Sequence, residues 1–169
     1  MHRFRPFLFA CLMLSLFFTS RALAYQQIEF IREIGKDTRK AEQRQFNAPR
    51  SLARSGDKFY IADTDASRVI VLDRRSGKTV LSWGEKGSKP GQFKSPGGIA
   101  VDEQGRVYVS DTGNNRIQVF DAGGQWVRSF GDKGSDPREF SSPSGIAAAR
   151  GLLYVADRGN GRVQVLTYD

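Results

Sequence analysis

A repeat of about 47 residues is the feature that most constrains the fold of this chain. Phe46, Phe93 and Phe140 are spaced 47 residues apart, and a proline three residues after each of them keeps that spacing. An aspartate and then an arginine recur later in each unit, with spacings of 48 and 46 residues. Self-similarity with a period of about 20 to 50 residues indicates a repeat architecture, so three copies of one structural unit are predicted.

Each unit has the pattern of a four-stranded antiparallel meander. In the second unit, four short runs of β-branched and aromatic residues alternate with turns rich in Gly, Asn and Asp. The second strand of each unit is apolar on successive residues, as in 59–61, 107–109 and 152–155. A strand with one wet face would alternate, so both faces are expected to be covered. Sheets stacked about an axis provide this cover, and an all-β fold of β-propeller blades is predicted.

The repeats resemble a known family. The segment Pro96-Gly-Gly-Ile-Ala-Val-Asp102, followed by Val107-Tyr-Val-Ser-Asp-Thr-Gly-Asn-Asn-Arg-Ile-Gln-Val-Phe120, is similar to the NHL repeat. Residues 143–166 match the same pattern, and residues 49–72 resemble a degenerate copy of it. The resemblance implies a six-bladed propeller. The repeat, together with the export signal and the missing catalytic residue types described below, predicts a non-enzymatic interaction scaffold for a protein, a peptide or a glycan.

The two ends of the chain suggest how such a ring closes. Residues 28–35 resemble the fourth strands at 79–84 and 126–131, whereas the third unit stops at Asp169, just after its third strand. Three blades are fewer than the four to eight of known propellers. Either two subunits close one six-bladed ring, each N-terminal strand completing the last blade of the partner, or the chain is a truncated relative with further repeats missing.

The N-terminal residues have the pattern of a secretory signal. Arg3 and Arg5 precede the apolar run 7–18, and Ala22-Leu23-Ala24 gives a small-x-small cleavage site before Tyr25. The apolar run is too short to span a bilayer. The predicted organisation is a signal peptide at 1–24, a strand and connector at 25–45, and repeats at 46–92, 93–139 and 140–169. An exported protein, periplasmic or extracellular, is expected.

The composition of the exported chain excludes several kinds of catalytic site. His2 and Cys11, the single His and the single Cys, lie in the predicted signal. Without them, disulfides, Cys nucleophiles and Ser-His-Asp triads are excluded within one subunit. The metal site that His and carboxylates form in related propeller lyases and hydrolases is also absent. Removal of the predicted signal, which contains three arginines, lowers the formal charge of the chain from +8 to +5. That charge favours solubility and does not require a nucleic-acid partner, although some NHL propellers bind RNA.

The candidate site residues surround the turn between the second and third strands of each unit. An Asp-x4-Arg pair spans this turn in every repeat, which suits a structural ion pair better than a catalytic site. Oxygen ligands for calcium occur beside it, but the carboxylates of a calcium loop do not. No catalytic residue, metal or cofactor is therefore expected, and a propeller-based lyase or hydrolase is the alternative. The structural pairs or binding-face turns are Asp63, Arg68, Asp111, Asn114, Asn115, Arg116, Asp157, Asn160 and Arg162.

Overall fold

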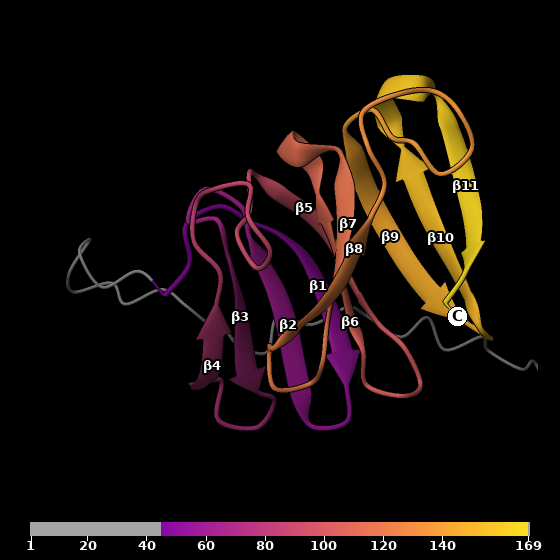
Figure 1. Ribbon diagram of the computed structural model, residues 1–169. Coiled ribbons are helices and arrows are strands. Elements are labelled where there is room, and N and C mark those ends of the chain that lie inside the picture. The colour runs from indigo at the N-terminus through magenta and orange to yellow at the C-terminus, as the bar shows by residue number, and fades with distance from the viewer. Residues whose placement is uncertain (1–44, 169) are drawn as a thin grey trace, which may run out of the picture. The chain divides into compact units, whose positions relative to one another are not determined.

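The computed structural model describes residues 45–168, and these form three antiparallel sheets that follow one another along the chain (Figure 1). We call the sheets blades 1, 2 and 3. Blade 1 consists of β1 (Pro49–Ser55), β2 (Lys58–Asp63), β3 (Arg68–Asp73) and β4 (Thr79–Trp83). Blade 2 consists of β5 (Pro96–Val101), β6 (Val107–Asp111), β7 (Arg116–Phe120) and β8 (Trp126–Phe130). Blade 3 consists of β9 (Pro143–Ala149), β10 (Leu152–Asp157) and β11 (Arg162–Thr167).

Each blade is a simple meander in which neighbouring strands in sequence are neighbours in the sheet. This confirms the predicted β-propeller blades. The predicted secretory signal, the connector up to residue 44 and the strand-like residues 28–35 lie outside the described residues. Within the described part of the chain, no helix is long and apolar enough to cross a membrane.

The one-residue irregularity of the repeat lies in the turn between the first two strands of a blade. At equivalent pairs, four residues lie between Arg54 and Phe59 in blade 1 and between Ala148 and Leu153 in blade 3. In blade 2 the equivalent pair is Val101 and Val107, with five residues between them. A turn on the surface accepts this change without moving the strands.

Two apolar cores lie between consecutive blades. We call the face of a blade that meets the next blade its front face, and the opposite one its back face. Between blades 1 and 2, Tyr60 and Val69 of a front face pack with Val109 and Phe120 of a back face. Between blades 2 and 3, Tyr108 and Ile117 of a front face form the second core with back-face residues of blade 3. Blade 2 is thus covered on both sides by another blade, which explains the continuous apolarity of its central strand β6.

A phenylalanine at the start of the second and third units fills the space between blades. Phe93 and Phe140 are fully buried. Each lies against a glycine that ends the preceding outer strand, Gly84 or Gly131, whose φ angles are +98° and +92°. A Cβ atom at Gly131 would lie 2.4 Å from the ring of Phe140. Glycine is required at these positions by both the positive φ and the close approach of the ring.

Candidate functional site

Three predicted site residues of blade 2, Asp111, Asn114 and Arg116, belong to one hydrogen-bonded network around a buried carboxylate. Asp111, at the end of β6, has no exposed surface. It accepts hydrogen bonds from the Lys94 amide at 2.7 Å, from Asn114 and Arg116 at 2.8 Å each, and from Gln118 at 3.1 Å. A buried charge is tolerated only when it is paired and hydrogen-bonded, and this one is.

The network ties the turn of blade 2 to the loop that enters the same blade. Arg116 donates to the carbonyl oxygens of Lys89 at 2.9 Å and Gln92 at 3.0 Å. Gln118, fully buried in β7, donates to the Gln92 carbonyl at 2.6 Å and accepts from the Gly91 amide at 3.0 Å. The side chains therefore hold the loop 84–92 by its backbone.

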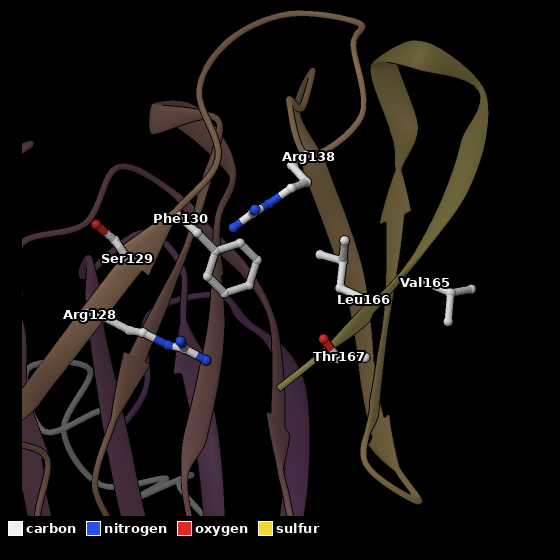
Figure 2. Close-up of a pocket in the computed structure, with 7 residues that line it drawn as sticks. All are labelled: Arg128, Ser129, Phe130, Arg138, Val165, Leu166 and Thr167. Atoms are coloured by element: carbon white, nitrogen blue, oxygen red, sulfur yellow. The ribbon is translucent and has the colours of Figure 1, made fainter. Parts of the chain in front are cut away.

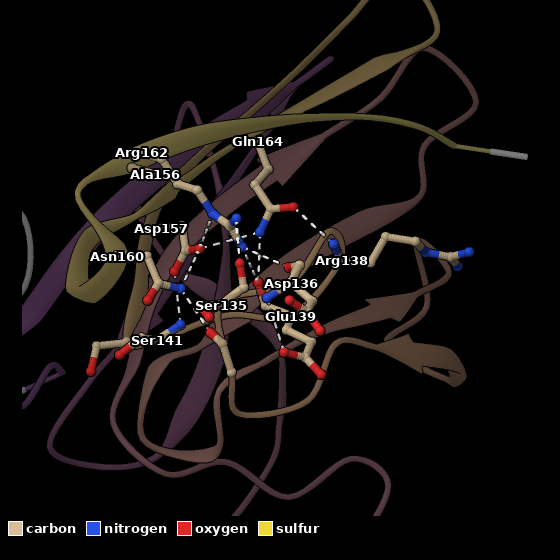
Figure 3. Close-up of polar contacts among 12 residues, drawn as sticks. Ser135, Asp136, Arg138, Glu139, Ser141, Ala156, Asp157, Asn160, Arg162 and Gln164 are labelled. Atoms are coloured by element: carbon tan, nitrogen blue, oxygen red, sulfur yellow. Dashed lines mark hydrogen bonds and ion pairs between the residues drawn. The ribbon is translucent and has the colours of Figure 1, made fainter.

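Blade 3 repeats this arrangement (Figure 3). Asp157 accepts from the Ser141 amide at 2.7 Å, from Asn160 and Arg162 at 2.8 Å each, and from Gln164 at 3.2 Å. In turn, Arg162 donates to three backbone carbonyl oxygens of the preceding loop, at 2.6 to 2.9 Å. These hydrogen bonds hold a loop of the same chain, and both oxygens of the Asp157 carboxylate accept hydrogen bonds.

Blade 1 keeps the ion pair of this network and its hydrogen bonds to the backbone, including that from the Asn47 amide to Asp63. Arg68 Nε lies 3.0 Å from Asp63, and Arg68 also donates to the Gln45 carbonyl at 3.1 Å. Ala66 and Ile70 stand where blade 2 has Asn114 and Gln118. The degenerate copy thus lacks the two amide side chains that complete the network.

Asn115 and a neighbouring threonine join one blade to the next. Asn115 adopts a left-handed conformation with φ of 55°, and its side-chain oxygen accepts from the Ser142 amide at 2.9 Å. Thr112 donates to the Pro143 carbonyl at 2.7 Å. The same bond links Thr64 of blade 1 to the Pro96 carbonyl of blade 2 at 2.8 Å. The structure thus gives all nine predicted site residues hydrogen-bonding roles within or between blades.

The buried carboxylate of Asp157 is held in its charged form. Burial by itself would raise the pKa of this group. The hydrogen bonds from Ser141, Asn160, Arg162 and Gln164 outweigh that effect, so the pKa of Asp157 lies below its ordinary value.

Because of this lowered pKa, the free energy of unfolding should decrease as the solution becomes more acidic. The unfolded chain takes up the proton at a higher pH than the folded chain does. The stabilisation is therefore present above the ordinary pKa of 3.8 and is lost as the pH falls toward the lower folded pKa. We expect the free energy of unfolding, measured with urea between pH 6 and pH 3, to fall below about pH 4. Asp157→Asn should flatten that fall, and an unchanged slope would contradict the assignment.

One polar cluster in blade 2 was not predicted from the sequence. Asp102 accepts from Arg106 Nε at 2.7 Å and from the buried Tyr108 hydroxyl at 2.9 Å. The guanidinium of Arg106 lies 5.3 Å from the ring centre of Tyr168. Burial, with the hydrogen bond to Asp102, raises the pKa of Tyr108. Asp102 is 6% exposed and Tyr108 is fully buried, so a substrate has no access to this carboxylate–phenol pair.

Among the grooves on the surface of the described residues are two that offer more room. The first, of about 510 Å³, separates β8 from β11, and we call it the outer groove (Figure 2). Its walls are formed by Arg128, Ser129, Phe130, Arg138, Val165, Leu166 and Thr167. The second, of about 260 Å³, lies between the turns of blades 1 and 2, and we call it the turn groove. It is lined by Thr64, Asp65, Ser67, Lys86, Lys94 and Ser95.

Comparison with protein families identifies the repeats. The NHL repeat model matches residues 93–120 and 140–166. The chain contains NHL repeats. Blade 1 has no match of its own to the model, in keeping with its missing amide side chains, but it folds as the same four-stranded meander.

Known proteins with NHL repeats match over short stretches. Human NHL repeat-containing protein 3 is 41% identical over 81 residues, which are 46% of this chain and 23% of that protein. Rat E3 ubiquitin-protein ligase TRIM71 is 44% identical over 57 residues, which are 31% of this chain and 7% of that protein. The chain thus spans less than a quarter of the length of these relatives.

A solved structure shares the fold of the NHL repeats. Hydrazine synthase from Kuenenia stuttgartiensis superposes with a TM-score of 0.59 over 83% of this chain and 36% of its own. The sequence identity is 19%, so the likeness is one of fold.

Proposed function

We propose that this chain is a non-enzymatic binding scaffold whose ligand is a protein, a peptide or a glycan. The observation that carries the proposal is the use of the Asp–Arg pairs. Asp111 and Asp157, the carboxylates best placed for chemistry, are buried and are saturated by hydrogen bonds that hold loops. Within residues 45–168, no three side chains of His, Cys, Asp or Glu are grouped as metal ligands.

The turn groove is the surface that suits a ligand best. Thr64, one of its lining residues, donates a hydrogen bond to the Pro96 carbonyl and so ties blade 1 to blade 2 beside the groove. Lys86 and Lys94 are exposed at its rim, and Asp65 is the carboxylate among its lining residues. Two ammonium groups and one carboxylate favour a ligand that presents negative charge, such as an acidic peptide or a uronic acid unit of a glycan.

A screen of ligands and activities tests the scaffold. The purified protein should bind members of an acidic peptide or glycan array, and the double variant Lys86→Glu/Lys94→Glu should lose that binding. Lys78→Glu, an exposed lysine in blade 1 outside the turn groove, is the matched control. The same protein should contain no stoichiometric metal and should turn over no substrate in a lyase and esterase screen. Stoichiometric metal or turnover would overturn the scaffold assignment.

Export is part of the proposal and rests on residues 1–24 of the sequence. The basic start, the apolar run and the Ala22-Leu23-Ala24 site together support it. N-terminal sequencing of the protein recovered outside the cytoplasm should begin at Tyr25. A chain that retains residues 1–24 would contradict processing at this site.

A further inference from the structure

The front face of blade 3 is apolar and exposed. Tyr154, Val163 and Val165 are 39%, 64% and 53% exposed. Tyr154 lies directly opposite Val165, and Ala156 lies opposite Val163, so these four side chains form one patch on the sheet. Contiguous apolar surface of this kind marks an interaction site.

The same positions are buried in the other two blades. In blade 2 they are Tyr108, Ile117 and Val119, which are at most 1% exposed, and in blade 1 they are Tyr60, Val69 and Val71, which are at most 2% exposed. The pairing is the same as well, because Tyr60 lies opposite Val71 and Tyr108 opposite Val119. The exposed patch therefore has the residues and the pairing of a surface that packs on another blade.

The outer edge of blade 3 also lacks a neighbour among the described residues. In blades 1 and 2 the third strand pairs with a fourth, β4 or β8, but β11 is the last strand of its sheet. The outer groove lies along this edge (Figure 2). In the corresponding groove between blades 1 and 2, of about 430 Å³, Trp126 of the fourth strand β8 contributes to the wall. The outer groove occupies the place of the missing strand.

We propose that the front face of blade 3 and the edge of β11 are the docking site for a second copy of this chain. The copy covers the face with the back face of its own blade 1 and adds its residues 28–35 to β11 as the fourth strand.

The back face of blade 1 has the required character. Ile61, Ile70 and Leu72 form an apolar cluster there with Phe46 and Phe59. All of them except Ile70 correspond in position to back-face residues of blade 2 that pack on blade 1.

One apolar side chain on the back face of blade 1 is exposed, although its counterpart in blade 2 is buried. Leu52 is 59% exposed, whereas Ile99, at the same place in blade 2, is 3% exposed. Ile61, Ile70 and Leu72 are already buried, so docking would change the exposure of Leu52 more than that of these three side chains.

In a closed ring of two copies, each copy covers the exposed face of the other. The interface joins two different surfaces, and such contacts form rings when the rotation closes. Three blades from each copy give six blades, which lies within the four to eight of known propellers. Closure also leaves no open sheet edge in blade 3, and open edges promote uncontrolled association.

The register of the added strand follows from the other blades. Trp83 and Phe130 each precede the glycine that ends a fourth strand, and they lie opposite Val69 and Ile117. Ile34 precedes Gly35 in the same way. The register places Ile34 of one copy opposite Val163 of the other.

Light scattering on the purified full chain tests the proposal. We expect a mass of two copies for the unaltered protein. Val165 is half-exposed in the single chain, so the Val165→Glu variant should still fold, which circular dichroism checks. The substitution should weaken association by more than about 100-fold, because docking would bury an unpaired charge. Leu52→Glu should have the same effect from the other side of the interface.

Val127→Glu is the matched control. Val127 is 49% exposed on β8 and lies outside the proposed interface, so this variant should remain a dimer. A folded monomer of the unaltered chain would overturn the proposal, as would a dimer that survives Val165→Glu. Loss of the dimer by Val165→Glu but not by Leu52→Glu would overturn the assignment of the blade 1 back face.

Discussion

Replacing Asp111 with alanine is expected to destabilise the protein by about 3–5 kcal/mol, the usual cost of breaking a buried ion pair by removing one partner. The carboxylate has no exposed surface, and the Arg116 side chain that it neutralises is only 15% exposed. The substitution also removes the acceptor of hydrogen bonds from Asn114, Gln118 and the Lys94 amide. Urea unfolding at pH 7, followed by circular dichroism, measures the change.

Asp57→Ala is the control for this prediction. Asp57 also pairs with an arginine, Arg74, at 3.0 Å, but the two side chains are 60% and 39% exposed. An exposed ion pair contributes less than about 1 kcal/mol, so this variant should unfold close to the unaltered protein. Equal losses for the two variants would contradict the role of burial in the Asp111 network.

Replacing Phe93 with alanine is expected to cost about 3–5 kcal/mol, as for other buried phenylalanines. The ring is fully buried between blades 1 and 2, and its centre lies 5.6 Å from that of Phe120. The backbone of the loop is fixed by the hydrogen bond from the Phe93 amide to the Glu85 carbonyl, so it cannot collapse freely into the cavity. The free energy of unfolding from urea titrations again measures the effect.

Val127→Ala, at a half-exposed site on β8, is the control for the loss of apolar volume. It should cost less than about 1 kcal/mol, because little apolar surface is withdrawn from water there. A Phe93→Ala variant as stable as Val127→Ala would show that the phenylalanine does not hold the blades together.

The repeat made most of the fold predictable. The spacing of Phe46, Phe93 and Phe140 marked the units, and the alternation of apolar runs with Gly and Asn turns marked the strands. The Asp-x4-Arg pairs were expected to meet across a turn, and Arg116 and Arg162 do contact Asp111 and Asp157. Local spacing sufficed because both partners lie within one hairpin.

The parts of the site that depend on distant contacts were missed. Gln118 and Gln164 contact loops more than 20 residues away, so the pattern of β7 or β11 alone does not reveal their role. A polar residue inside an apolar strand was the available signal. The Asp102–Tyr108 pair occurs in one blade only, so the repeat did not mark it. The exposure of Val163 could not be predicted either, because it depends on which blade lies next to it.

Disulfide trapping tests the central claim, that one copy completes the last blade of another. Cys11 is the sole cysteine of the sequence, so a Cys11→Ser background is free of thiols. A chain that carries Ile34→Cys and a second chain that carries Val163→Cys would be co-expressed in this background, oxidised and run on a non-reducing gel. Opposite residues of paired strands lie about 4.5–5.5 Å apart at Cα, within reach of a disulfide. A covalent dimer is predicted for this pair and not for Ile34→Cys with Val127→Cys, and folded chains that stay unlinked would contradict the account.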